Sequence, residues 1–190
     1  MQKTVLSAQG LLEDSFRLAA NVLKDDYRPS LIIAIWRGGT PVGMALQELM
    51  AYCGVNADHI AIRTSSYHGV DKRSNTVAVH GLDYIIDTIN IEDRLLIVDD
   101  VFDTGNTIAA VIAEIRRRAR DNMAEDVRIA VPWYKPARNQ TTLTPDYFVH
   151  ETDEWLVFPH ELDALDGDEL RIARPALAEV IEQAHSAKAS

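Results

Sequence analysis

Four consecutive apolar residues, Leu95–Val98, run directly into the two carboxylates Asp99 and Asp100. A short, continuous apolar run is typical of a strand that is buried on both faces, and such strands occur in parallel sheets covered by helices. An ionised carboxylate beside a hydrophobic core loses hydration, so the two aspartates require partners where the strand ends. The sequence therefore predicts a buried parallel strand with a polar site at its end.

The rest of the chain alternates between helical and strand patterns. The spacing of apolar residues predicts helices over Ser7–Asp25, Pro41–Tyr52, a stretch that includes Ile108–Ile115, and Glu169–His185. Strand patterns cover Leu31–Ile35, His59–Thr64 and Val127–Val131 before Pro132, and Tyr147–Phe158 alternates as a strand or a hairpin would. The polar segment Ser65–Asn75 is expected to be a mobile loop. We therefore expect an α/β fold with a mainly parallel central sheet flanked by helices, and ligands beyond the carboxyl ends of its strands.

Size and charge restrict the possible partners. With 190 residues the chain is expected to form a single domain. An excess of 29 acidic over 19 basic residues gives a formal net charge of -10, which disfavours binding to nucleic acid or to an anionic membrane. A single cysteine, Cys53, no apolar core in the first residues and no apolar run of ~20 residues predict a cytoplasmic protein without a membrane segment.

The segment Asp103–Thr107, Asp-Thr-Gly-Asn-Thr, is a small polar turn that opens directly into a predicted helix. Amide groups at a helix start favour an anion such as phosphate, Gly105 allows close approach, and the threonine hydroxyls add donors. The carboxylate pair before the turn can accept hydrogen bonds from a ribose diol or hold Mg²⁺. The turn and the pair together suit a ribose 5-phosphate, although a plain helix cap with an acidic approach is the alternative.

The string from Leu95 to Thr107 resembles closely the phosphoribosyl pyrophosphate (PRPP) binding motif of the type I phosphoribosyltransferases. Trp36–Gly43 is similar to the pyrophosphate-binding loop of the bacterial xanthine-guanine members, which implies that Arg37 and Gly38 bind pyrophosphate. The PRPP-binding residues implied by the resemblance are Arg37, Gly38, Asp99, Asp100, Asp103, Thr104, Gly105, Asn106 and Thr107.

Further segments extend the resemblance to the base and to the metal. Lys135 stands where the family's lysine contacts the 6-oxo group of a purine, and Trp155 and Leu156 stand where a ring stacks on the base and a backbone reads its edge. Lysine only donates hydrogen bonds, so it favours an oxo group over the amino group of adenine. Asp100 and Glu161 are the implied magnesium residues, although relatives usually carry an aspartate at the position of Glu161.

Ser65, Ser66 and Tyr67 resemble the start of the family's flexible catalytic loop, which closes over the reacting atoms and excludes water. The resemblance covers roughly residues 30 to 163 and implies a core over about 30–132 and a small base-binding hood over about 133–163 together with the N-terminal helix. The tail that follows is left unexplained.

The resemblance implies a Mg²⁺-dependent purine phosphoribosyltransferase of nucleotide salvage, which is a dimer or tetramer. It would transfer a phosphoribosyl group from PRPP to hypoxanthine, guanine or xanthine, with Asp103 as the general acid or base near the purine N7. Two alternatives remain. A non-catalytic sensor of PRPP or nucleotides would need an exposed basic surface, for which Arg116–Arg118 with Arg120 is the one cluster. A pyrimidine or orotate phosphoribosyltransferase is disfavoured, because Lys135 and Trp155 resemble residues that contact a purine.

Overall fold

The computed structural model describes residues 3–68 and 75–188. The chain divides into two compact units, Met1–Gly10 with Glu154–Ser190 and Leu11–Asp153. Leu11–Asp153 is the larger unit, and Met1–Gly10 with Glu154–Ser190 is the smaller unit.

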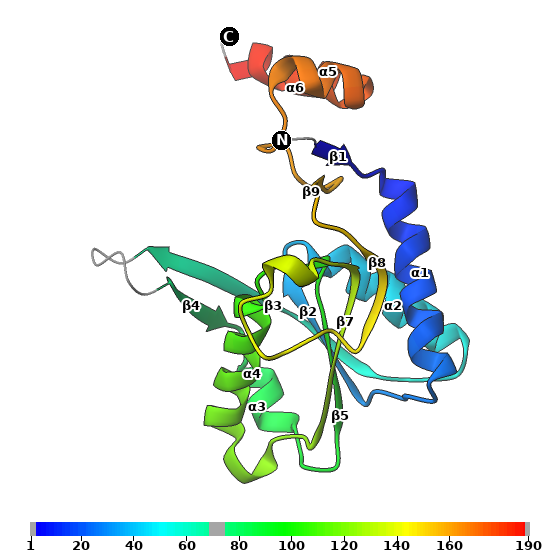
Figure 1. Cartoon of the computed structure of the whole chain (residues 1–190), viewed down its shortest axis with the longest axis vertical. Helices are drawn as coiled ribbons and strands as arrows, with labels where there is room; N and C mark the ends of the chain where they lie inside the picture. The colour runs from blue at the N-terminus through cyan, green and yellow to red at the C-terminus, as the bar shows by residue number, and fades with distance from the viewer. Residues whose placement is uncertain (1–2, 69–74, 189–190) are drawn as a thin grey trace. The chain divides into compact units, whose positions relative to one another are not determined.

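The larger unit is built on a seven-stranded sheet (Figure 1). In spatial order its strands are β4 (Asn75–His80), β3 (Asp58–His68), β2 (Leu31–Trp36), β5 (Arg94–Val98), β7 (Asp126–Tyr134) and β8 (Tyr147–Glu151), and the short β6 (Val101–Phe102) pairs with β7 beyond the end of β5. All of these neighbours are parallel except β3 and β4. The mainly parallel sheet predicted from the sequence is therefore confirmed.

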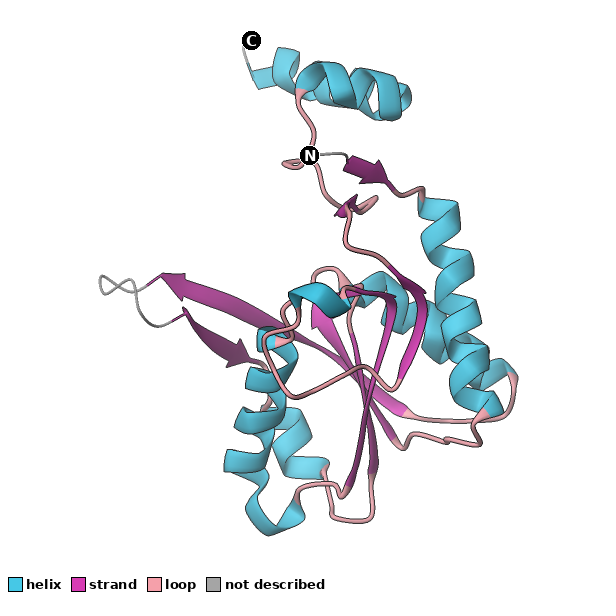
Figure 2. Cartoon of the chain, in the orientation of Figure 1, coloured by secondary structure: helices cyan, strands magenta, loops and turns pink. Residues whose placement is uncertain are grey.

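Helices cover both faces of this sheet (Figure 2). The helices are α1 (Ala8–Lys24), α2 (Gly39–Tyr52), α3 (Asp83–Thr88) and α4 (Asn106–Ala119), with the 3-10 turns η1 (Arg120–Asn122) and η2 (Pro136–Arg138). Ile33 and Ile97 point to one face and form a core with Ile108 and Ile115 of α4. Because side chains alternate along a strand, Ala34 points to the other face, where it meets Gly43 of α2. None of the described helices is long and apolar enough to cross a membrane.

The smaller unit joins both ends of the chain. Its two strands, β1 (Lys3–Val5) and β9 (Trp155–Val157), are parallel, and they are followed in sequence by α5 (Gly167–Ala173) and α6 (Pro175–Lys188). The single C-terminal helix predicted over 169–185 is wrong, because the chain breaks at Arg174, with φ -144° and ψ 65°. The physical reason is Pro175, which disfavours helical geometry in the residue before it.

Two further boundaries differ from the predictions. The predicted loop Ser65–Asn75 is partly strand, because β3 continues to His68 and pairs with β4 from Asn75; the rest of that loop lies outside the described residues. Strand β7 does not end at Pro132 but continues to Tyr134. Pro132 is tolerated because it has no partner in the register with β8, where Val131 and Trp133 are the paired residues.

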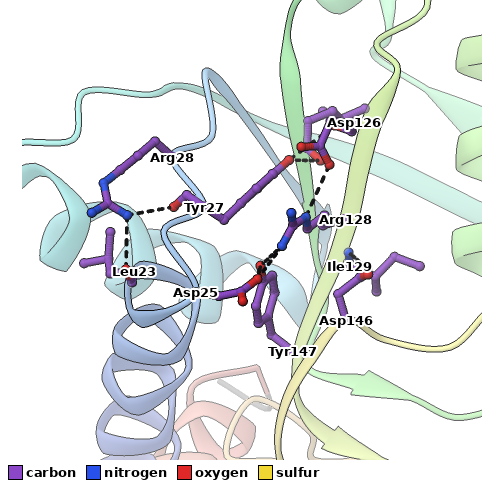
Figure 3. A network of polar contacts seen from close by, with 10 residues as sticks. Leu23, Asp25, Tyr27, Arg28, Asp126, Arg128, Ile129, Asp146 and Tyr147 are labelled. Atoms are coloured by element: carbon purple, nitrogen blue, oxygen red, sulfur yellow. Dashed lines mark hydrogen bonds and ion pairs between the residues drawn. The ribbon is translucent and has the colours of Figure 1, made fainter.

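Arg128 of β7 ties the end of α1 to the sheet through a network of polar contacts (Figure 3). Its Nη1 lies 2.5 Å from Asp25 Oδ2, and it also donates to the hydroxyl of Tyr147. Its guanidinium group lies 4.2 Å from the centre of the Tyr27 ring, and the Tyr27 hydroxyl donates to the carbonyl of Leu95 at 3.1 Å. Burial, together with the hydrogen bond to Asp25, raises the pKa of Tyr147 to about 12, so this hydroxyl stays protonated at neutral pH.

We expect Arg128→Met to lower the free energy of unfolding by about 2 kcal/mol, because hydrogen bonds to charged groups are lost from a partly buried network. Arg117→Met is the matched control, since its ion pair with Glu114 at 2.7 Å is exposed. The control should lose clearly less stability, because exposed ion pairs contribute little. Urea denaturation of both variants measures the difference, and equal losses would contradict a structural role for the network.

Candidate active site

Asp99 and Asp100 directly follow the last residue of β5. They separate β5, which ends at Val98, from β6, so the chain bends at these two residues instead of continuing as a strand. The Asp99 carboxylate accepts hydrogen bonds from the amides of Asp100, at 3.0 Å, and Gly39. Burial, reinforced by the neighbouring Asp100 carboxylate, raises the pKa of Asp99 well above its usual range. The carboxylate pair is therefore electrostatically costly, as the sequence predicted.

The loop after β2 lies directly against this pair. A Cβ atom added to Gly38 would lie 2.1 Å from Asp100 Oδ2, and one added to Gly39 would lie 2.5 Å from the carbonyl oxygen of Val98. Only glycine permits an approach this close. The preceding peptide bond, Trp36–Arg37, is cis, and Arg37 is exposed. The predicted pyrophosphate residues Arg37 and Gly38 are thus brought beside the predicted ribose and metal residues.

The predicted phosphate turn borders an open cavity. Residues 99–105, 107 and 108 line a cavity of about 170 Å³. Gly105 precedes α4 with φ 79°, a conformation that favours glycine. Within the part of the chain that the structure describes, the amides of Thr104, Gly105 and Thr107 donate to no backbone carbonyl. The turn can therefore receive an anion at the start of a helix, where amide groups and the helix dipole favour negative charge.

Asp103 lies between two cations. Lys135 Nζ is 3.7 Å from Asp103 Oδ2, and Arg138 Nε is 2.6 Å from Asp103 Oδ1. Lys135 is only 5% exposed, which excludes a solvated surface lysine. Arg138 is a residue that the sequence analysis did not select, although it ends the segment that carries Lys135. Its charge and its spacing from Lys135 were visible in the sequence, but its partner was not.

The remaining predicted residues lie in β3, in β9 and in the chain that follows β9. Ser65, Ser66 and Tyr67 lie in β3, and the Ser65 hydroxyl is 3.2 Å from His80 Nε2 of β4. In the smaller unit, Trp155 and Leu156 belong to β9, where Trp155 is exposed and Leu156 is buried. Glu161 accepts a hydrogen bond from the amide of Phe158 at 3.0 Å, so its carboxylate closes a local turn.

The donor set at the end of β5 fits Mg²⁺. Among residues 3–68 and 75–188, no group of three or more histidine, cysteine, aspartate or glutamate side chains could by itself hold a metal ion. Mg²⁺ at phosphate-transfer sites is usually held by one or two carboxylates together with substrate oxygens and water. Asp99 and Asp100 supply two carboxylates, and a cation would offset the cost of burial and of mutual repulsion, which together raise the pKa of Asp99.

We expect Gly39→Ala to destabilise the protein by about 1–3 kcal/mol, because the new methyl group would overlap the Val98 carbonyl and push the start of α2 away from β5. Gly167→Ala is the matched control, since its Cβ would meet no atom closer than 4.0 Å. Thermal and urea unfolding measure the effect. A Gly39→Ala variant as stable as Gly167→Ala would show that the loop does not need this contact.

Comparison with known proteins identifies a family and solved structures that share this fold. A family model described as a phosphoribosyl transferase domain matches residues 1–166, which leaves α5 and α6 outside the match. A purine phosphoribosyltransferase from Pyrococcus horikoshii is 30% identical, with a TM-score of 0.66 over 85% of this chain and 95% of that one. A search of curated proteins finds no match.

Two further solved structures share the fold at lower identity. A hypothetical protein from Neisseria gonorrhoeae with bound ppGpp is 21% identical, with a TM-score of 0.71 over 92% of this chain and 97% of that one. A xanthine-guanine-hypoxanthine phosphoribosyltransferase from Helicobacter pylori is 22% identical, with a TM-score of 0.63 over 86% of this chain and 96% of that one.

Proposed function

Because the chain belongs to the phosphoribosyl transferase family, we propose that it transfers the 5-phosphoribosyl group of PRPP to a 6-oxopurine: hypoxanthine, guanine or xanthine. The products are the nucleoside monophosphate and pyrophosphate, as in purine salvage. The observation that carries the proposal is the cavity in which the carboxylate pair and the open amides of the phosphate turn lie side by side. That arrangement offers acceptors for a ribose diol and donors for its 5-phosphate.

In this proposal each group at the site has a separate role. The amides and hydroxyls of Thr104–Thr107 bind the 5-phosphate, and Asp99 and Asp100 accept hydrogen bonds from the ribose hydroxyls. Arg37 and the glycine loop bind the pyrophosphate that leaves C1. Asp100 would hold Mg²⁺ together with substrate oxygens, and the ion would supply positive charge for that leaving group. The new C1–N bond forms as the C1–O bond breaks, and the proton displaced from the purine passes to Asp103.

Lys135 supplies the preference for 6-oxopurines in this proposal. Its ammonium group is buried near Asp103, and an ammonium group can donate a hydrogen bond to an oxo group but cannot accept one from an amino group. Trp155 and Leu156 are proposed to stack on the base and to contact its edge. Ser65, Ser66 and Tyr67 are proposed to begin a segment that closes over the reacting atoms, and Glu161 is proposed as a second metal residue.

A second candidate is a protein of the same fold that binds nucleotides without turning them over. The Neisseria gonorrhoeae structure with bound ppGpp favours it. Two of the four arginines in the basic cluster that such a regulator would use on nucleic acid are paired here, Arg117 with Glu114 and Arg118 with Asp83. Measured turnover of PRPP with a base distinguishes the two candidates.

We also propose that the protein is cytoplasmic and that it forms a dimer or a tetramer. Light scattering of the purified protein measures the assembly state.

We expect the purified protein to form nucleoside monophosphate from PRPP, Mg²⁺ and at least one 6-oxopurine, and to lose this activity when Mg²⁺ is chelated. Initial rates are measured with hypoxanthine, guanine, xanthine, adenine and orotate, and readdition of Mg²⁺ is the control for chelation. Binding of nucleotides without product from any base would contradict an enzyme and favour the sensor. Product from orotate alone would contradict the purine assignment.

We expect Lys135→Ala to raise KM for the 6-oxopurine by about tenfold or more, because a hydrogen bond to a charged donor is lost. KM for PRPP should change little, since the phosphate turn and the carboxylate pair are intact. Lys24→Ala, at the exposed end of α1, is the matched control. Equal increases in both KM values would remove Lys135 from base recognition.

A further inference from the structure

The two carboxylate oxygens of Asp103 have different surroundings. Oδ1 is fully buried, has no hydrogen-bond partner among the described residues, and forms an ion pair with Arg138, whose Nε lies 2.6 Å away. Oδ2 lies 3.7 Å from Lys135 Nζ, which is longer than a hydrogen bond. The side chain as a whole is 33% exposed, so its accessible part is not Oδ1. Oδ2 is therefore the oxygen that a ligand can reach.

Arg138 is itself fixed by the segment that carries it. Its amide donates to the carbonyl of Lys135 at 3.1 Å, which closes η2. Two residues later, the amide of Gln140 donates to the carbonyl of Thr104 at 2.9 Å, and its side-chain oxygen accepts from Asn106 Nδ2 at 3.2 Å. The amide of Lys135 donates to the carbonyl of Phe102 at 2.9 Å, so the segment after β7 is fastened to the chain on both sides of Asp103.

Thr141 adds a steric contact to these hydrogen bonds. A Cβ atom placed on Gly105 would lie 2.6 Å from Thr141 Oγ1, so the segment packs directly on the glycine of the turn. A rotation of Arg138 away from Asp103 would remove the nearer of its two cations and leave only Lys135, 3.7 Å from Oδ2, which costs more at a buried oxygen than the loss of an exposed ion pair. The side chain of Arg138 is 45% exposed, but the oxygen that it pairs with is buried, so the ion pair is only partly open to solvent.

We propose that Arg138 is a positioning residue for phosphoribosyl transfer: it holds Oδ1 of Asp103 so that Oδ2 faces the purine nitrogen. This inference rests on the proposed function and adds to it a residue that does not itself contact the substrate. Arg138 sets the direction of the acceptor oxygen, and the contacts of Gln140 and Thr141 place Arg138 relative to the phosphate turn. The base site and the phosphate site are thereby held in one fixed geometry.

The first test compares kcat with KM in Arg138→Gln, Arg138→Lys and the control Arg117→Gln. Arg138→Gln should lower kcat by about tenfold or more, the change expected from loss of a charge-assisted contact, with KM for PRPP within about twofold of wild type. Arg138→Lys should recover part of kcat, because it restores the charge without the planar group. Arg117→Gln should match wild type. A wild-type kcat in Arg138→Gln, or a loss confined to KM for PRPP, overturns the inference.

A double-mutant cycle with Asp103→Asn is the second test. If Arg138 acts through Asp103, Arg138→Gln should cost little further activity in the Asp103→Asn background, whereas independent losses that multiply overturn the positioning role. Thermal unfolding of each variant separates misfolding from a catalytic effect, and Arg138→Lys serves if Arg138→Gln is unstable. No product from the wild-type chain with any base would overturn the proposed function itself, whereas an active wild type with multiplying losses overturns only the role of Arg138.

Discussion

Two adjacent carboxylates follow β5 and lie against the loop after β2: Asp100 is buried and Asp99 is half-buried, so both need compensation from the groups around them. Two adjacent carboxylates repel each other, and the pKa of Asp99 rises as a result of burial and this repulsion. The amides of Gly39 and Asp100 supply some of the hydrogen bonds that water would have supplied. The loop can come this close only because positions 38 and 39 are glycines. A bound cation or ribose would offset the remaining cost.

The same geometry explains how a short stretch of chain can serve several parts of one substrate. The bend at Asp99 and Asp100 ends β5, β6 carries the chain on for two residues, and the turn at Gly105 then starts α4. Carboxylate acceptors and amide donors are therefore separated by only a few residues, and they line one cavity. The segment after β7 closes the arrangement by placing Lys135 and Arg138 against Asp103. Positioning and charge stabilisation, rather than a covalent nucleophile, are what such a site can provide.

The errors in the sequence analysis arose where long-range pairing decided the outcome. The segment from Ser65 was predicted as loop because it is polar, yet pairing with β4 extends β3 to His68. Strand β7 passes through Pro132 because the neighbouring strands do not require a hydrogen bond there. The break before Pro175 is a different case, because proline chemistry alone could have predicted it.

The sequence by itself determined the buried strand Leu95–Val98, the acidic bend, the phosphate turn and the helix that follows, because each depends on residues close together in the chain. It also contained Lys135, Trp155 and Leu156, which we propose for base binding. Only the tertiary structure decided that Gly39 packs on the Val98 carbonyl and that Arg138 pairs with the buried oxygen of Asp103. Such contacts join segments 35 or more residues apart, and they depend on strand order and register, which local periodicity does not encode.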